Sequence, residues 1–406
     1  MAKRIDHAHA EITHRQRILA AIRGEAVDRV PWVPRLDLWY IANRTRGTLP
    51  DCWDGWTLPE ITRDLGVGRH EVIPNFLDVE EPDQIADQSL GIMHVANQPY
   101  RLRFRETERD VERDGDRYLV TYRTPVGAIT TELIHTERMR LDGVTLLHTA
   151  ERAIKSARDY EVVAFVFEDL EVVPGGRYDS FHEQVGDEGV AVALANVAAS
   201  PVHHLLKELV PYDEFYFNLH DHPDLIAETA ARMTGFFRDV VEACAQSNAE
   251  VVMLGANYDV MLTPPPLFAE HIAPFLTEAT NKLHDAGKLV ATHTDGENEG
   301  LLDLYLQCGI DLADSVCPTP MTRLPLAAYR EAFGNHPAIW GGICSASVLP
   351  SSFTDAEFEA HIEEVIEAAE DFRGMIYSIA DTTPPDASID RIRRIGERLA
   401  QIDPEA

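Results

Sequence analysis

From about residue 150 onward, short apolar runs alternate with longer segments whose apolar positions recur every three or four residues. This pattern predicts helices over residues 150–167, 223–246, 266–286, 301–308 and 354–369. It predicts strands over residues 190–197, 215–218, 250–255, 288–292, 312–316, 338–343 and 375–379. Strands that alternate with helices are typical of a parallel sheet with crossover helices.

Between residues 97 and 135 the pattern changes to apolar and polar alternation, as in 117–123, with turn-forming residues at Asp114-Gly115 and at 125–127. This indicates an antiparallel β-hairpin insert. Upstream, a short helix over 13–23 and an extended segment form an N-terminal extension. We therefore expect one domain over residues 1–406, a (β/α)8 TIM barrel of α/β class that carries the insert at 97–135.

Polar side chains directly follow the predicted strands. They are Asn257, Tyr258 and Asp259 after the run 250–255, His293 and Asp295 after 288–292, Cys317 after 312–316, Cys344 after 338–343, and Asp381 after 375–379. In a (β/α)8 barrel the carboxyl ends of the strands converge on one face, where active sites lie. These residues therefore form a predicted pocket.

Each of these residues also has a plainer interpretation. Asp259 and Asp295 are residue types that cap helices or form turns, and a cysteine that ends a strand is often buried filler. In His293-x-Asp295 an imidazole and a carboxylate lie on the same side of an extended segment, so the pair suits metal binding or proton transfer.

One cluster of aromatic residues and one pair of histidines remain to be interpreted. Trp39 and Tyr40 follow Arg35 and Asp37, and together with two later tryptophans they are either core or the wall of a ligand pocket. The pair at residues 203–204 lacks the spacing that places two imidazoles on one helix face, so we expect surface or capping histidines there.

Charge and composition exclude several classes of function. The chain has 36 Lys and Arg against 68 Asp and Glu, a formal net charge of −32, which argues against nucleic-acid or anionic-membrane binding. The hydrophobic content of 45% is that of an ordinary globular protein. No apolar run reaches the ~18 residues of a membrane span. Five cysteines, an odd number, argue against a disulfide framework and favour a cytoplasmic protein.

Several blocks of the chain resemble the uroporphyrinogen decarboxylase superfamily, especially its bacterial branch. They are residues 15–34, 124–131, 154–165, 284–297, 340–345 and 383–395. The resemblance implies a (β/α)8 barrel and suggests a homodimer. Residues 35–40 read RLDLWY where the decarboxylases carry Arg-Gln-Ala-Gly-Arg-Tyr, and a porphyrinogen rich in carboxylates would be repelled by this chain. Haem biosynthesis is therefore the weaker interpretation.

The methyltransferase branch of the superfamily resembles methylcobalamin:coenzyme M methyltransferases, which hold zinc through His-x-Cys, a glutamate and a second cysteine. By position, the corresponding metal ligands here are His293, Asp295, Cys317 and Asp381. Carboxylates stand at both family cysteine positions, so the site is richer in oxygen and less soft.

We therefore predict a methyltransferase that demethylates a small compound, such as an aryl methyl ether, and passes the methyl group to a corrinoid. The sequence has no Asp-x-His-x-x-Gly motif, so a partner protein would supply the cobalamin. The expected catalytic residues are His293, Asp295 and Asp381. The expected substrate contacts are Arg35, Asp37, Trp39, Asn257, Tyr258, Asp259 and Cys344.

Two alternatives stay open at this stage. One is a metal-independent decarboxylase of a small or porphyrinogen-type acid, in which Arg35 holds a carboxylate and His293 or Asp381 supplies the proton. The other is a barrel that binds a ligand without catalysis.

Overall fold

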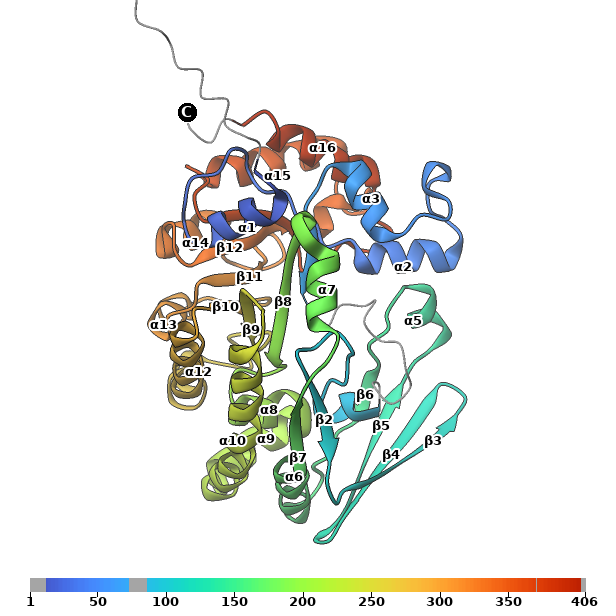
Figure 1. The fold of residues 1–406 in the computed structure, drawn as a ribbon, viewed down its shortest axis with the longest axis vertical. Helices are drawn as coiled ribbons and strands as arrows, with labels where there is room; N and C mark the ends of the chain where they lie inside the picture. The colour runs from blue at the N-terminus through green and yellow to red at the C-terminus, as the bar shows by residue number, and fades with distance from the viewer. Residues whose placement is uncertain (1–11, 73–85, 370, 403–406) are drawn as a thin grey trace, which may run out of the picture.

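A curled parallel sheet forms the centre of the computed structural model, which describes residues 12–72, 86–369 and 371–402 (Figure 1). Its seven strands, in spatial order, are β1 (Arg69–Val72), β8 (Gly189–Asn196), β9 (Val251–Leu254), β10 (Leu289–His293), β11 (Leu312–Val316), β12 (Ala338–Cys344) and β13 (Met375–Ala380). Spatial order follows chain order, so the carboxyl ends of neighbouring strands lie at one edge.

Apolar side chains fill both faces of this sheet, as parallel sheets require. Strands β8, β9, β11, β12 and β13 are buried at every position. One face packs with Val190, Val251, Leu312 and Ile376 into an inner cluster, which also takes in Ile18 from the first helix. The other face packs against the surrounding helices in a larger cluster.

Both edges of the seven-stranded sheet bond to the extended segment 31–33. The Val33 amide donates to Tyr377 O over 2.9 Å, and the Tyr377 amide donates to Pro31 O over 3.0 Å. On the other side, the amide of Gly68, the residue before β1, donates to Trp32 O over 3.0 Å. The N-terminal segment thus lies between the first and last strands.

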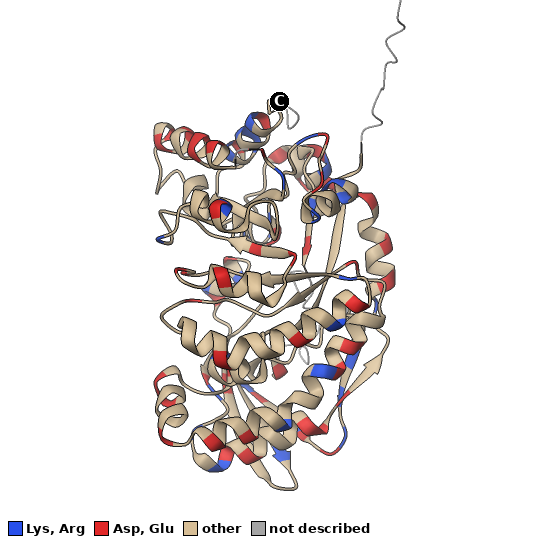
Figure 2. Ribbon diagram, turned by 90° about the vertical axis from the view of Figure 1, so that its left-hand side faces the viewer, with Lys and Arg blue, Asp and Glu red and all other residues tan. Residues whose placement is uncertain are grey.

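The helices lie around the outside of the sheet (Figure 1). They are α1 (His14–Ile22), α2 (Asp37–Arg46), α3 (Leu58–Leu65), α5 (Glu137–Leu141), α6 (Ala157–Asp169), α7 (Tyr178–Val185), α8 (Pro201–His204), α9 (Tyr212–Asp221), α10 (Pro223–Gln246), α11 (Pro265–Leu267), α12 (Ala273–Asp285), α13 (Leu302–Cys308), α14 (Leu326–Phe333), α15 (Asp355–Ala368) and α16 (Ile389–Leu399). No helix in the described ranges is both long and apolar enough to cross a bilayer. Acidic residues are spread along the helices rather than gathered in one patch (Figure 2).

Antiparallel strands flank the parallel sheet, as the alternation predicts. Strands β3 (Glu108–Asp114), β4 (Arg117–Thr124), β5 (Gly127–Ile134) and β6 (His148–Glu151) form one sheet, and β2 (Tyr100–Phe104) pairs with β7 (Leu170–Pro174). The insert therefore reaches beyond the predicted bounds of 97–135. Later residues complete both sheets, and the sequence between them does not alternate.

Buried Asp87 fastens this insert to the rest of the molecule. It lies in the short helix η2 (Asp87–Leu90) and is fully shielded from solvent. Its carboxylate accepts hydrogen bonds from Arg109 on β3 and from the Tyr122 hydroxyl on β4. A buried carboxylate needs such partners to stay charged.

Two predicted elements are wrong. The run 215–218 lies inside helix α9, which follows Pro211, because a short apolar run does not distinguish a strand from a buried helix face. The helix predicted over 150–167 begins only at Ala157, after a Ser156 cap, and its first two predicted residues belong to β6.

Candidate functional site

His293 ends strand β10 and is held from behind by Asp314. The imidazole Nδ1 lies 2.6 Å from Asp314 Oδ2, and Asp314 is only 3% exposed. Burial alone would raise the pKa of Asp314, but hydrogen bonds and charge from His293 and His70 hold it well below its usual range. An ionised carboxylate only accepts, so Nδ1 donates and Nε2 faces the site.

A bulge in β11 turns two consecutive side chains toward the site. The register of β11 against β12 shifts between Asp314 and Val316, and Ser315 between them has φ of 60°. In a regular strand neighbouring side chains point to opposite faces, whereas a bulge re-aims them. Ser315 Oγ accordingly lies 3.2 Å from Asp381 Oδ1.

Asp381 follows β13 and pairs with Arg35 at the start of α2. Arg35 Nη1 donates to Asp381 Oδ1 over 2.8 Å, and Arg35 Nε lies 3.4 Å from Asp37 Oδ1. His293 Nε2 lies 3.6 Å from the same Asp381 oxygen. Residues from three distant parts of the chain thus meet at one point.

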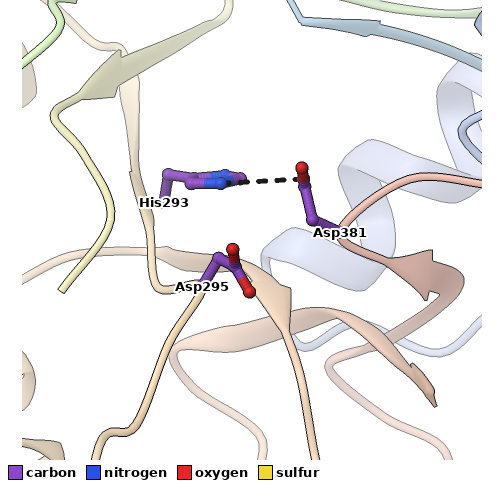
Figure 3. A group of neighbouring side chains, drawn as sticks. All are labelled: His293, Asp295 and Asp381. Atoms are coloured by element: carbon purple, nitrogen blue, oxygen red, sulfur yellow. Dashed lines mark ion pairs between the residues drawn. The ribbon is translucent and has the colours of Figure 1, made fainter. Parts of the chain in front are cut away.

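Asp295 completes a group of three side chains that point toward one another (Figure 3). One ligand atom each from His293, Asp295 and Asp381 lies within 4.8 Å of the others. Two donors on one tetrahedral zinc ion, with bonds of ~2.0–2.2 Å, lie about 3.3–3.6 Å apart. The three groups would have to move closer together to share an ion, and one nitrogen with two oxygens is a donor set that zinc accepts.

Burial and neighbouring charges shift the acid–base behaviour of the group. Burial lowers the pKa of His293, but the Asp314 hydrogen bond and the charges of Asp381, Asp314 and Asp295 outweigh it and raise the pKa. Burial, then the charge of Asp381, raises the pKa of Asp295. Burial raises the pKa of Asp381, but Arg35 and His293 lower it overall. The group can therefore hold either a proton or a cation.

The two predicted cysteines stand apart from this group. Cys317 is outside the cluster of three ligand atoms, although burial and the nearby charges of Asp295, Cys344 and Asp381 raise the pKa of its thiol to about 12. Cys344 ends β12 and is fully buried. Of the four predicted ligands, the structure brings together His293, Asp295 and Asp381.

A cavity of about 270 Å³ opens beside His293. Its charged and polar lining residues are Arg35, His70, Gln88, Lys207, Glu208, Asn257, His293 and Asp314. Apolar side chains from β1, β8 and β9, and residues of the loops around them, line the rest. This volume lies just below the ~300–1,000 Å³ of pockets for drug-sized ligands. The cavity suits a small molecule far better than a tetrapyrrole.

The residues after β9 have separate roles. Asn257 lines the cavity, and its amide lies 3.4 Å from Asp295 Oδ2. Tyr258 is fully buried and its hydroxyl lies 2.8 Å from Thr292 Oγ1, so it supports β10 from behind. Asp259 accepts from the Met261 amide over 2.8 Å and shapes its own loop.

The segment after Pro34 contributes Arg35 and Asp37 to the site, but its aromatic residues face elsewhere. Trp39 is 3% exposed and packs edge-to-face on Trp53 with ring centroids 6.2 Å apart. Trp39 is not among the described residues that line the cavity. The aromatic cluster is therefore largely core.

Surface or capping histidines were predicted at 203–204, and the surface placement is wrong. His203 and His204 are each 1% exposed. His203 stacks on Tyr258, and His204 Nε2 lies 2.7 Å from Leu90 O. Burial lowers the pKa of His203 to about 3 and that of His204 to about 4, so both rings are neutral.

Sequence reasoning missed Asp314, His70 and Lys207. Asp314 and His70 lie within strands β11 and β1 rather than after them, and His70 Nε2 lies 3.9 Å from Asp314 Oδ1. A charged residue inside an apolar parallel strand needs a buried partner, and this signal in the run 312–316 was available. Lys207 lies in a π-helical turn with no sequence signature.

Comparison with known proteins agrees with this architecture. A methyltransferase from Methanosarcina mazei has a similar fold, with a TM-score of 0.51 and 15% sequence identity over 96% of this chain and 98% of that one. A search of curated proteins finds no match. The model of the family "Uroporphyrinogen decarboxylase (URO-D)" matches residues 187–401, more than half of the chain. The chain belongs to the uroporphyrinogen decarboxylase (URO-D) family.

Proposed function

We propose that this protein is a methyltransferase that takes a methyl group from a small methylated compound and passes it to a corrinoid on a partner protein. The observation that carries the proposal is the convergence of His293, Asp295 and Asp381 within 4.8 Å at the strand ends. Family membership and the similar fold of a methyltransferase support it.

We also propose that the sheet is a closed (β/α)8 barrel. The segment 31–33 would serve as its eighth strand, because it bonds to β13 on one side and to the residue before β1 on the other. The strand ends then surround one mouth, as in other barrels of this class.

The reaction requires the site to stabilise the leaving heteroatom. Transfer breaks the bond between the methyl carbon and its heteroatom, and the electron pair stays on the heteroatom. A cation or a proton must stabilise that pair as it develops. The three carboxylates of Asp295, Asp314 and Asp381 around one imidazole can hold either.

With a divalent ion, His293, Asp295 and Asp381 would be the ligands, and the ion would supply Lewis acidity at the heteroatom. The described residues fit this role because Asp314 fixes the tautomer and direction of His293, as carboxylates do behind metal-binding histidines. Arg35 orients Asp381 from the other side.

Without an ion, His293 itself would protonate the leaving heteroatom. Its raised pKa favours the protonated ring, and Nε2 faces the cluster rather than its supporting carboxylate. A general acid works best with a pKa near the operating pH.

The test mixes the purified protein with reduced cobalamin and methylated ethers, amines and thioethers. We expect methylcobalamin absorbance with at least one donor class, and its loss in His293→Ala. The exposed His220, whose one ion-pair partner among the described residues is its neighbour Asp221, provides the matched control His220→Ala. No absorbance change with any donor would contradict the proposal.

Elemental analysis separates the two versions of the site. The metal version predicts about one divalent ion per chain, which Asp381→Ala should lose. If methyl transfer is undiminished after a chelator has removed any metal ion, the version in which His293 supplies a proton would be supported instead.

A decarboxylase of a small acid is the second candidate. It is favoured by the guanidinium of Arg35 and the raised pKa of His293 at one site, since these could hold a carboxylate and protonate the carbon that loses CO₂. Release of CO₂ without cobalamin, and no methyl transfer, would identify it.

A further inference from the structure

The cavity has a second polar end, formed by Lys207 and Glu208 on the π-helical turn η4 (Leu205–Leu209). Lys207 Nζ donates to Val197 O over 3.2 Å and lies 3.0 Å from Glu208 Oε1. An ammonium group carries three N–H donors. Within the described part of the chain, these two contacts leave one donor of Lys207 for a ligand.

The backbone segments that carry the two ends are separated by one strand. Val197 follows β8, His293 ends β10, and β9 lies between these two strands. Two strand spacings of ~4.8 Å put the backbones of β8 and β10 about 10 Å apart. The cavity lining also includes apolar side chains, among them Leu194 of β8 and Met253 of β9. The cavity thus combines polar groups on two segments with an apolar wall.

The two ends differ in charge. Glu208 is in contact with Lys207 and near Arg152, so two cations flank one carboxylate. Burial raises the pKa of Glu208, but the charges of Lys207 and Arg152 lower it overall. At the other end, the carboxylates of Asp295, Asp314 and Asp381 outnumber the guanidinium group of Arg35.

We propose that the cavity takes a small carboxylic acid, whose carboxylate binds Lys207 while its methyl-bearing end lies at His293. A chain with a net charge of −32 repels anions at long range, so selection of an acid requires a local cation. Lys207 is then the residue that determines specificity. The position of the methyl-bearing end rests on the proposed function, whereas the carboxylate contact does not.

The test measures binding calorimetrically with two matched pairs of probes. The first pair is 4-methoxybutanoate and 4-methoxybutanamide, which have nearly the same size and differ in charge. The second pair is 3-methoxybenzoate and 3-methoxybenzamide. In at least one pair we expect the wild-type protein to bind the acid about tenfold more tightly than the amide, as for a charge-assisted hydrogen bond.

Two variants of adjacent residues predict opposite changes. Lys207→Met should abolish the preference for the acid and leave amide affinity unchanged. Glu208→Gln removes the carboxylate that competes for Lys207, so it should tighten acid binding several-fold. Lys282→Met is the control, because Lys282 is half exposed on α12 and pairs with Glu242; it should change neither affinity.

Several results would overturn the assignment: equal affinity for acid and amide in both pairs, a preference that survives in Lys207→Met, weaker acid binding in Glu208→Gln, or no saturable binding of any probe. An acid preference that depends on Lys207, without methyl transfer to cobalamin, would keep the assignment and contradict the proposed function instead.

Discussion

At the scale of single residues, Asp314 orients the histidine of the candidate site. It is not one of the three clustered ligand residues, yet its 2.6 Å contact sets which nitrogen of His293 faces Asp381. The contact is charge-assisted because the pKa of Asp314 is held low. The orientation of His293 thus depends on one buried carboxylate.

We predict that Asp314→Asn weakens zinc or cobalt binding by about 10–100-fold, the usual effect of losing a carboxylate behind a metal-binding histidine. Asparagine has nearly the same shape as aspartate, but its side chain is a neutral amide, so His293 Nδ1 loses its charged hydrogen-bond partner. Calorimetric metal titration measures the effect. Exposed Asp303 on α13 gives the control Asp303→Asn, and equal metal affinity in both variants would contradict the role assigned to Asp314.

Much of the site at this scale follows from the sequence. His293, Asp295 and Asp381 were predicted because each follows an apolar strand, and strand ends converge. Cys317 has the same sequence signal but lies outside the cluster of ligand atoms, since side-chain direction depends on the bulge at Ser315. A bulge has no reliable signature in one sequence.

At the scale of elements, the loops after β9 and β10 are bound to each other. The Val260 amide donates to Glu297 O over 2.9 Å. Gly296 has φ of 117°, and a Cβ there would lie 2.3 Å from Tyr258 O. Only glycine allows this approach of two backbones, which places Asp295 beside His293.

We predict that Gly296→Ala destabilises the protein by at least about 2 kcal/mol, through a backbone clash and an unfavourable φ. It should also weaken metal binding, because Asp295 moves. Gly235→Ala is the control of opposite sign: Gly235 lies within α10 with nothing near its would-be Cβ, and alanine should stabilise the helix by about 0.5–1 kcal/mol. Denaturant unfolding measures both, and equal stability of the two variants would refute the clash.

Elements with regular patterns were predictable and irregular ones were not. The helix over 223–246 and the strand over 312–316 match α10 and β11, because their periodicity is strong. Strand β1 reads Arg-His-Glu-Val and has no apolar run. Its polar residues are buried by pairing with each other, as Arg69 does with Glu71, and this pairing appears only in the folded chain.

At the scale of the whole molecule, buried histidines contribute to the response of stability to acid. The folded pKa values of His203 and His204, about 3 and 4, lie below the unfolded value of ~6.5. The unfolded chain therefore binds more protons below pH ~6.5. The stability that these rings contribute is fully present above that pH and is lost as the pH falls toward 4.

We predict a loss of about 1.4 kcal/mol per buried ring between pH 7.5 and 5.5, since one pKa unit corresponds to that energy. Replacing His203 with glutamine, which does not titrate, should make the pH dependence shallower by that amount. Urea unfolding at the two pH values measures it, and His220→Ala, at an 89% exposed side chain, is the control. An unchanged slope in His203→Gln would contradict the low pKa.

The pairing of Arg35 with Asp381 also affects when the site can assemble during translation. These residues are 346 positions apart, and the segment 31–33 meets Tyr377 over a similar span. Contacts between residues so distant in sequence form late and slow folding. The site therefore stays incomplete on the ribosome until almost the whole chain has been translated, and a nascent chain that stalls earlier has no assembled cluster.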